Sequence, residues 1–336
     1  MTQSVIEQEA SVPEELHAPL VEIEDLHVSF PQVEGIVQAV RGVSLTLAPG
    51  ESLGIVGESG SGKSVSCMAV MRLLRSPPAR IAAAKLTLDG IDVAAADRRQ
   101  MAGLRGSVAA MIFQDPMTAF DPVFTIGGQI VETIRAHRAV TKSAARAEAL
   151  SLLERVEIRN AEAILDSYPH QLSGGMLQRA MIAMALSCRP RVLFADEPTT
   201  ALDVTVQAQI LQLIKDLQDE FGMGLVMVTH DLGVVAETVD RVVVMYGGKV
   251  METAPVIDIF ERPAHPYTRA LLVSIPGQEG GRQRLTEIPG SSPDPMDPPR
   301  GCPFHPRCPE AGPDCVAAMP PVTELGEGRS AACWRL

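Results

Sequence analysis

A glycine-rich octapeptide constrains this chain more than any other feature of its sequence. Residues 57–64 read GESGSGKS, directly after the apolar run SLGIV and directly before a run with the pattern of a helix, SVSCMAVMRLL. Glycines in this setting let successive backbone N–H groups curl around phosphate oxygens, and the helix N-terminus adds a partial positive charge. The order of strand, glycine loop and helix therefore predicts a binding site for a nucleoside triphosphate.

Two side chains of this phosphate loop (residues 57–64) have predicted partners of their own. Lys63 is expected to reach the β- and γ-phosphates, and Ser64 to bind the accompanying Mg²⁺. The flanking strand and helix make a chance glycine turn a poor explanation of the pattern. The nucleotide-binding residues predicted in the loop are Gly57, Ser59, Gly60, Gly62, Lys63 and Ser64.

A second motif is the apolar run VLFADE, which ends in the acids Asp196 and Glu197. A carboxylate at the carboxyl end of a parallel strand lies beside the phosphate loop in such sheets. Asp196 is therefore expected to hold Mg²⁺ through its water shell, and Glu197 to polarise the attacking water. A buried strand that ends in Asp-Glu is common, so this interpretation depends on the phosphate loop in the same chain.

A third motif, LSGGM at residues 172–176, precedes the helical run LQRAMIAMAL. A serine and two glycines at the start of a helix form an anion-binding N-terminus, the second in this chain. A plain helix cap made by Ser173 is the alternative, and it would be preferred if the segment stood alone.

The pattern along the chain predicts an α/β fold. VLFADE and GLVMVTH are short apolar runs separated by a helical stretch, the strand–helix–strand order of a parallel sheet. From about residue 125 to 186, Ala, Leu, Arg and Glu dominate, and Ala149, Leu152 and Val156 fall on one helical face. RVVVMYGGKV predicts a hairpin with Gly247 and Gly248 at its turn.

Composition excludes several classes of protein. With 336 residues the chain can bury a sizeable core, so it is no small disulfide scaffold. A formal net charge of −12 argues against a nucleic-acid partner. No stretch approaches the roughly 20 apolar residues of a membrane-crossing helix. Residues 1–20 are polar and acidic and lack the pattern of an export signal, so we expect a mobile tail and a cytoplasmic protein.

The C-terminal region, residues 276–336, is rich in proline and cysteine. Between positions 289 and 321, 11 of 33 residues are proline, which predicts a loop-built segment held together by something other than a sheet. Four thiolates on such a segment suit a tetrahedral zinc ion or a [4Fe–4S] cluster, and unliganded thiols are a third possibility. Zinc sites usually have closer cysteine pairs, so the spacing favours the cluster. The predicted ligands are Cys302, Cys308, Cys315 and Cys333.

The motifs occur together in one order. GESGSGKS, FQD with Gln114, LSGGM, VLFADEP, ALD with Asp203 and THD with His230 follow one another along the chain. In this order they resemble the ATPase subunits of ABC transporters over about residues 21–275. The resemblance implies a P-loop ABC ATPase core with a β-rich opening subdomain and a helical insert at about residues 115–190.

The same resemblance implies that two subunits stack head to tail around two ATP molecules. Ser173, Gly174 and Gly175 of one subunit would then contact the nucleotide that is bound at Lys63 of the other. Asp203 is implied to be a contact across the dimer. The resemblance thus implies a ligand for the anion-binding helix N-terminus at LSGGM, namely the γ-phosphate of the ATP that is bound to the neighbouring subunit.

Three further roles follow from the resemblance alone. Gln114 is implied to link Mg²⁺ to the membrane subunits, Glu197 to be the general base and His230 to clamp the γ-phosphate. An aromatic residue ahead of the phosphate loop usually stacks on adenine in this family. Phe30 is the only aromatic residue before Phe113, so it either stacks on adenine or packs in the core.

Two segments narrow the resemblance to peptide and nickel importers. These are FQDPMTAFDPVFTIGGQI and ERPAHPYTRALLVSIPG, and the cysteine-rich tail is similar to the extension in which iron–sulfur cysteines are implicated in that group. The resemblance implies an ATP-hydrolysing motor at the cytoplasmic face of the inner membrane, as a peripheral protein. Its expected partners are a second ATPase subunit, a paralogue rather than itself, two permeases and an extracytoplasmic binding protein. We expect His265 to be a structural connector.

An alternative function is a soluble ABC-type ATPase of DNA repair or chromosome organisation, with a zinc module that contacts DNA. Such proteins need a long coiled-coil insertion or a basic face, and neither is found in this sequence. Translation-type ABC factors carry two ATPase cores, whereas this sequence has one phosphate loop.

Overall fold

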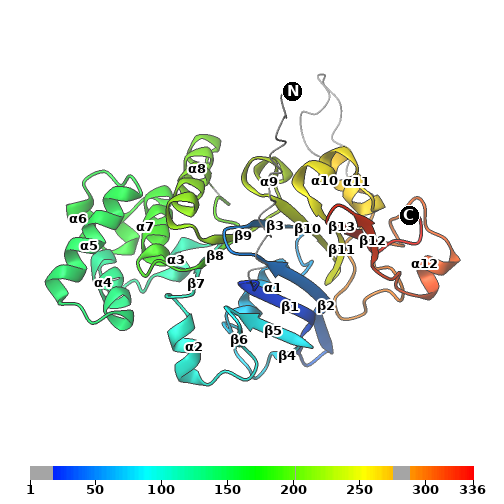
Figure 1. Cartoon of the computed structure of the whole chain (residues 1–336), viewed down its shortest axis with the longest axis horizontal. Helices are drawn as coiled ribbons and strands as arrows, with labels where there is room; N and C mark the ends of the chain where they lie inside the picture. The colour runs from blue at the N-terminus through cyan, green and yellow to red at the C-terminus, as the bar shows by residue number, and fades with distance from the viewer. Residues whose placement is uncertain (1–17, 201, 275–287) are drawn as a thin grey trace, which may run out of the picture.

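The computed structural model describes residues 18–200, 202–274 and 288–336. Its first part is an antiparallel sheet in the strand order β2-β1-β5-β6, with β4 paired to β1 (Figure 1). Alternating burial along β1 shows that one face of this sheet packs on the core, as the alternating sequence predicts. The strands are β1 (Val21–Pro31), β2 (Ile36–Leu47), β4 (Arg80–Ala82), β5 (Lys85–Leu88) and β6 (Ile91–Asp92).

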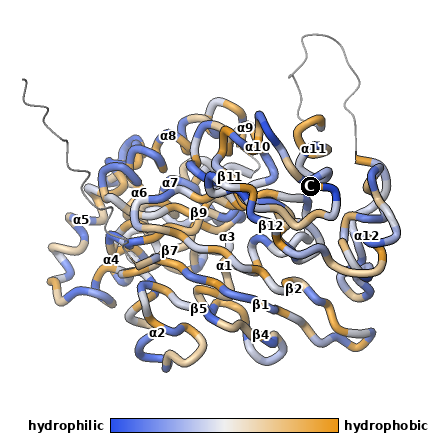
Figure 2. The backbone as a smooth tube through the Cα atoms, turned by 45° about the vertical axis from the view of Figure 1, so that its right-hand side comes forward, coloured by the Kyte–Doolittle hydropathy of each residue, from blue (hydrophilic) through white to orange (hydrophobic). Residues whose placement is uncertain are grey.

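The larger sheet has the order β12-β13-β11-β10-β3-β9-β8-β7, and its members from β10 to β7 run parallel. Every residue of β3, β7, β8 and β9 is buried, which explains their continuously apolar sequences. Figure 2 shows hydrophobic residues along β7 and β9 in the middle of the molecule. The strands are β3 (Ser52–Val56), β7 (Ala109–Ile112), β8 (Val192–Asp196), β9 (Gly224–Thr229), β10 (Arg241–Tyr246) and β11 (Lys249–Pro255).

Helices cover this sheet, and a group of them projects beyond its β7 edge. The projecting helices lie between β7 and β8 and form the left-hand part of Figure 1. Ala149, Leu152 and Val156 are all buried, as the helical pattern predicts. The projecting helices are α3 (Pro116–Ala119), α4 (Ile126–His137), α5 (Lys142–Arg155), α6 (Ala161–Leu165) and α7 (Gly174–Leu186), with a 3-10 turn at Pro169–Gln171.

The remaining helices lie outside this projecting group, and α1, α9 and α10 among them contact strands of the sheets. The structure contains α1 (Lys63–Val70), α2 (Arg98–Leu104), α8 (Val204–Phe221), α9 (Leu232–Thr238), α10 (Val256–Glu261), α11 (Pro266–Val273) and α12 (Pro313–Ala317). Across the three described ranges, none of the helices is both long and apolar enough to span a bilayer. The hairpin prediction is confirmed, because β10 and β11 pair antiparallel and Gly247 and Gly248 turn with φ of 54° and 79°.

The C-terminal extension corrects one expectation. The proline-rich stretch is loop-built, but β12 (Thr323–Gly326) and β13 (Arg329–Ala331) then add two strands to the larger sheet through β11. The prediction that something other than a sheet holds this end together is therefore wrong for its last part. The run TELGEGRSA lies beyond the prolines, and glycines at φ of 79° and 71° allow its tight turn. Most of the predicted acidic tail, 1–17, lies outside the described residues, and Leu20 is already buried.

Candidate functional site

The predicted phosphate and acid residues meet at one edge of the larger sheet. β7, β8, β9 and β3 are neighbours and parallel, so their carboxyl ends share that edge. Gln114 follows β7, Asp196 ends β8, His230 follows β9 and the phosphate loop follows β3. Segments that are far apart in the sequence are thereby brought together.

The phosphate loop needs glycine at two positions for steric reasons. Gly57 has φ of 148°, and a Cβ there would lie 2.1 Å from the carbonyl oxygen of Met245. Gly62 has φ of 98°, and its Cβ would lie 2.5 Å from the carbonyl oxygen of Ala39. Ser59 and Gly60, by contrast, are exposed to solvent. The glycines of the motif thus shape a loop that is pressed against β2 and β10 on one side and open on the other.

Lys63 is buried at the start of α1, with 6% of its surface exposed. Its Nζ donates to the carbonyl oxygens of Gly57 at 2.8 Å and Glu58 at 2.9 Å. Burial lowers the pKa of Lys63, while the nearby carboxylates of Glu197 and Asp196 act in the opposite direction. The ammonium group is thus fixed inside the loop, where it can meet phosphate oxygens.

Ser64 and Asp196 form the predicted Mg²⁺ pair. Ser64 Oγ donates to Asp196 Oδ1 at 2.7 Å. Burial raises the pKa of Asp196, and the Ser64 hydrogen bond opposes that rise. Mg²⁺ takes oxygen ligands and is usually held by one or two protein groups plus phosphates and water. A hydroxyl and a carboxylate beside the phosphate loop fit this preference.

Glu197 lies at the centre of a polar network. Gln114 Nε2 donates to Glu197 Oε2 at 2.9 Å, and His230 Nδ1 lies 3.2 Å from Oε1. Thr200 Oγ1 also donates to Oε2, at 2.8 Å, and sequence reasoning missed this residue. Its position three residues after Glu197, in the turn that follows β8, is the signal that could have identified it. Glu197 has φ of 47°, a conformation that is uncommon for a residue with a side chain and often found at functional sites.

The LSGGM segment lies at the N-terminus of α7, where Ser173 caps the helix. Ser173 Oγ accepts from the backbone N–H of Met176 at 3.4 Å, and both Ser173 and Gly174 are exposed. Asp203 caps α8 in the same way, with Oδ1 3.0 Å from the N–H of Val206. Gly175 is partly buried. These residues are accessible from outside the chain, as a contact with a second subunit requires.

Phe30 lies near the end of β1 and is partly buried. It is paired with Val37 of β2, two residues from Ala39, whose carbonyl oxygen lies against Gly62. The side chain also packs against the core around the smaller sheet. Adenine stacking by Phe30 stays a prediction.

The four C-terminal cysteines lie in one region. Burial raises the pKa of Cys302 to about 11, and the neighbouring thiols of Cys315, Cys308 and Cys333 add to the rise. Within the described residues, however, no three His, Cys, Asp or Glu side chains are arranged to hold a metal ion. The predicted [4Fe–4S] cluster gains no support from this result, and neither does the zinc alternative.

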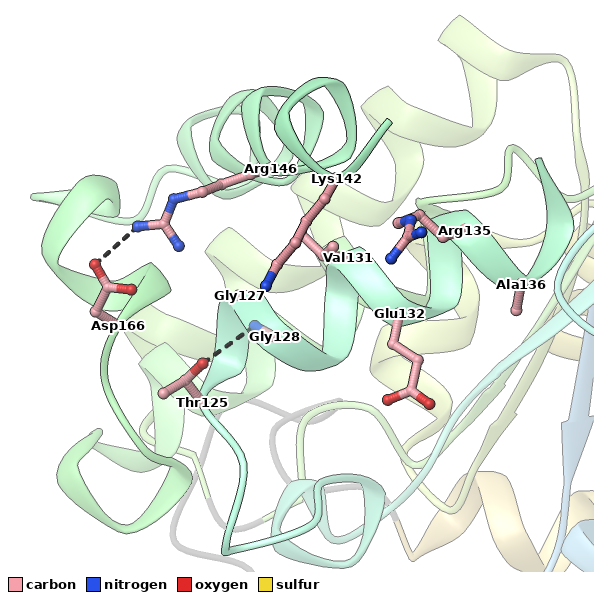
Figure 3. Close-up of a pocket in the computed structure, with 10 residues that line it drawn as sticks. All are labelled: Thr125, Gly127, Gly128, Val131, Glu132, Arg135, Ala136, Lys142, Arg146 and Asp166. Atoms are coloured by element: carbon pink, nitrogen blue, oxygen red, sulfur yellow. Dashed lines mark hydrogen bonds and ion pairs between the residues drawn. The ribbon is translucent and has the colours of Figure 1, made fainter. Parts of the chain in front are cut away.

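One cavity in the described part of the chain lies away from the phosphate loop. Its volume is about 780 Å³, and α4 and α5 form most of its wall (Figure 3). Arg146 donates to Asp166 across it at 2.8 Å, and Lys142 points into it. None of the site residues predicted from the sequence lines this cavity.

Fold and site together define a P-loop ATPase. A glycine loop between strand and helix, a buried lysine, a hydroxyl–carboxylate pair and a polar network around a second acid occupy one sheet edge.

Comparison with known proteins gives the family. Residues 40–200 match the ABC transporter family, and residues 251–315 match the C-terminal region of oligopeptide/dipeptide transporters. The chain is 50% identical to a probable peptide ABC transporter ATP-binding protein of Sinorhizobium fredii, over 94% of this chain and 95% of that protein. It is 47% identical to the dipeptide transport ATP-binding protein DppD of Escherichia coli, over 94% and 96%.

A solved structure has the same fold as this chain. The ATP-binding cassette MJ0796, described as a dimeric post-hydrolysis state bound to ADP and Pi, superposes with a TM-score of 0.62 at 29% identity. The match covers 70% of this chain and 98% of that one. The chain belongs to the ATP-binding proteins of ABC transporters, and it is an ATPase of that class. The alternative of a DNA-repair or chromosome-organising ATPase is not supported, because the relatives named above are transport proteins.

Proposed function

We propose that this chain is the ATP-hydrolysing subunit of a membrane importer of peptides. Two relatives that match nearly its whole length are described as a peptide and a dipeptide transport protein, and residues 251–315 match the oligopeptide/dipeptide C-terminal region. Two permeases and an extracytoplasmic binding protein complete the importer. The chain then works as a peripheral protein at the cytoplasmic face of the membrane.

The observation that carries the ATPase chemistry is the meeting of Ser64, Asp196 and Glu197 at one sheet edge. Lys63 and the loop N–H groups bind the β- and γ-phosphates, and Ser64 and Asp196 hold Mg²⁺. Bound Mg²⁺ supplies charge neutralisation for the phosphates. Glu197 accepts the proton of the attacking water as the bond between the γ-phosphorus and the leaving ADP oxygen breaks.

Gln114 and His230 complete the reacting side of the site. Both contact the Glu197 carboxylate, so they fix its orientation before the nucleotide binds. In the proposed role His230 contacts the γ-phosphate, and Gln114 reports the state of the site to the membrane subunits. Phe30 is proposed to stack on adenine, because its strand partner lies beside the β2 segment that touches Gly62.

The site is proposed to be completed by a second ATPase subunit, a paralogue rather than a second copy. The exposure of Ser173 and Gly174 supports such a contact, and the similar cassette MJ0796 is described as dimeric. Ser173, Gly175 and Asp203 then contact the partner's nucleotide or the partner itself. In this arrangement, residues 21–275 form the ATPase domain and residues 276–336 the extension.

Peptide uptake tests this function directly. Cells that lack the chain should regain uptake of a labelled dipeptide with the wild-type chain but not with Lys63→Ala, which removes the phosphate-binding ammonium group. Lys215→Ala is a matched control, because Lys215 is an exposed lysine of α8. Dipeptide uptake that is unchanged by Lys63→Ala, or restoration of nickel uptake alone, contradicts the proposal.

We further propose that the cysteines hold a [4Fe–4S] cluster that staples the extension. The thiols of Cys315, Cys308 and Cys333 lie close enough to Cys302 to raise its pKa, which supports their proximity.

Protein purified without oxygen should contain iron and acid-labile sulfide, and Cys308→Ser should lose both. Cys188→Ser is the control, because Cys188 lies near Ser187 and Thr133 outside this set. Zinc in place of iron, or no metal at all, contradicts the cluster.

A further inference from the structure

Two side chains of the C-terminal extension form hydrogen bonds with one residue of the phosphate loop, Glu58. Arg307 Nη1 donates to Glu58 Oε2 at 2.7 Å and to Oε1 at 3.0 Å, across 249 residues of sequence. Ser292 Oγ also donates to Oε2. The backbone N–H of Glu58 donates to Tyr267 Oη at 2.9 Å, and its carbonyl oxygen accepts from Lys63 Nζ. The carboxylate, N–H and carbonyl of this loop residue are therefore all engaged.

Arg307 is held in place on every side. Its side chain is 7% exposed, and it donates to the carbonyl oxygens of Pro289 at 2.9 Å and Ile288 at 3.0 Å. Its guanidinium also donates to Tyr246 Oη at 3.0 Å and lies 5.7 Å from the centre of that ring. A guanidinium fixed in this way cannot turn toward a phosphate. Its direct contact with the phosphate loop is the carboxylate of Glu58.

An aromatic cluster makes this contact stiff. The ring centres of Tyr246 and Tyr267 lie 4.5 Å apart, and that of Phe304 lies 5.3 Å from Tyr246 and 5.2 Å from Tyr267. All three rings are fully buried. Phe304 and Arg307 belong to one turn of the extension, in which the N–H of Arg307 donates to the carbonyl oxygen of Phe304 at 2.9 Å. The turn is thus packed against Tyr246 at the end of β10 and Tyr267 at the start of α11.

The negative charge of Glu58 lies near the position at which ATP phosphates are proposed to bind. Glu58 lies close enough to Lys63 to favour its charged form, so it also lies close to where Lys63 binds phosphate. An unneutralised carboxylate there repels a triphosphate. Arg307 supplies the opposite charge from a buried position, where solvent screens the pair weakly.

We propose that Arg307 is a positioning residue for ATP: it neutralises Glu58 and fixes the phosphate loop, so that the C-terminal extension sets the affinity for the nucleotide. This inference rests on the proposed ATP site. It gives the extension a task in the ATPase cycle that does not depend on what its cysteines bind.

Neutral and charged replacements of Arg307 in the full-length chain test the proposal. Arg307→Gln should weaken ATP binding about tenfold, with kcat at saturating ATP within about twofold, whereas Arg307→Lys should stay within about threefold of wild type. Adding Glu58→Gln to Arg307→Gln should restore most of the affinity, because the repelling charge is gone. Arg335→Ala removes an exposed ion pair of the same extension, with Asp314 at 3.1 Å, and should leave affinity unchanged.

Isothermal titration with ATP and steady-state hydrolysis give Kd, KM and kcat, and thermal melting identifies variants that fail to fold. Equal affinity in Arg307→Gln and wild type overturns the proposal. If the double variant Arg307→Gln with Glu58→Gln binds ATP as weakly as Arg307→Gln alone, the proposal is also overturned. Such a result would mean that Arg307 acts through packing and not through its charge. If Arg307→Gln fails to fold, the single variants Arg307→Lys and Glu58→Gln test the proposal instead. A tenfold loss of ATP affinity in either of these two variants contradicts charge neutralisation. Failure of the wild-type chain to bind ATP overturns the proposed ATP site instead.

Discussion

Ser64 and Asp196 are 132 residues apart in the sequence, and their side chains share a 2.7 Å hydrogen bond. The contact forms because β3 and β8 lie on either side of β9, so the residues after β3 and at the end of β8 face each other across one strand. Burial raises the pKa of Asp196, because a carboxylate charge is poorly solvated at this position. A cation beside this pair relieves that cost.

The first prediction concerns Glu197, which accepts hydrogen bonds from Gln114 and Thr200. Glu197→Gln removes the base but keeps the shape of the side chain, so ATP should bind while hydrolysis slows by about 10²- to 10⁴-fold. Size-exclusion chromatography with ATP should then show a trapped dimer of ATPase subunits. Glu22→Gln alters only an exposed pair with Lys85 and is the control. Hydrolysis at the wild-type rate in Glu197→Gln contradicts the assignment of the base.

The second prediction concerns Gly62. Gly62→Ala places a Cβ 2.5 Å from the carbonyl oxygen of Ala39 at φ of 98°, so the chain should lose about 1–3 kcal/mol of stability and bind ATP poorly. Gly103→Ala is the matched control, because nothing lies within 4 Å of its Cβ and the position is helical. That variant should gain a few tenths of a kcal/mol up to about 1 kcal/mol. Equal melting temperatures of the two variants would show that the loop shifts freely.

The sequence predicted the centre of the site because its residues form short local motifs. A glycine loop or an acid pair is visible within eight residues, and the parallel order of the strands then places both at one edge. Thr200 was missed because its only signal is its position three residues after Glu197, and a single hydroxyl forms no motif. The contact between Arg307 and Glu58 could not be predicted either, since nothing local in a proline-rich segment indicates which residue it reaches 249 positions away.

The strands at the C-terminus show a second limit. β13 pairs with β11 over only two positions, Glu252 with Ala331 and Thr253 with Ser330. Strands this short carry little periodicity, so the preceding prolines dominated the prediction of a loop. These residues form strands because β13 pairs with β11 at the edge of the larger sheet, a tertiary contact that the local sequence does not show.

The third prediction separates capping from catalysis at Ser173. Ser173 caps α7 and Thr141 caps α5, with donor–acceptor distances of 3.4 Å and 3.2 Å. Alanine at either position should cost about 1 kcal/mol of stability. Only Ser173→Ala should also slow ATP hydrolysis, by about tenfold or more, because its hydroxyl is proposed to contact the partner's γ-phosphate. Equal hydrolysis rates in the two variants, measured with the partner subunit present, contradict that contact.

The last prediction concerns the buried His265, whose Nδ1 accepts from the N–H of Tyr267 at 3.0 Å and caps α11. Burial lowers its pKa to about 4, and the charge of Arg269 adds to this effect. The unfolded chain takes up a proton near pH 6.5 and the folded chain only near pH 4, so stability should fall as the pH drops through this window, by about 3 kcal/mol. His265→Asn keeps an acceptor for the cap but does not titrate, so urea unfolding at pH 7 and pH 4.5 should show a smaller difference than in wild type. His27→Asn changes an exposed histidine and should keep the wild-type difference. A difference that is the same in His265→Asn and wild type would mean that other groups control the acid sensitivity of the fold.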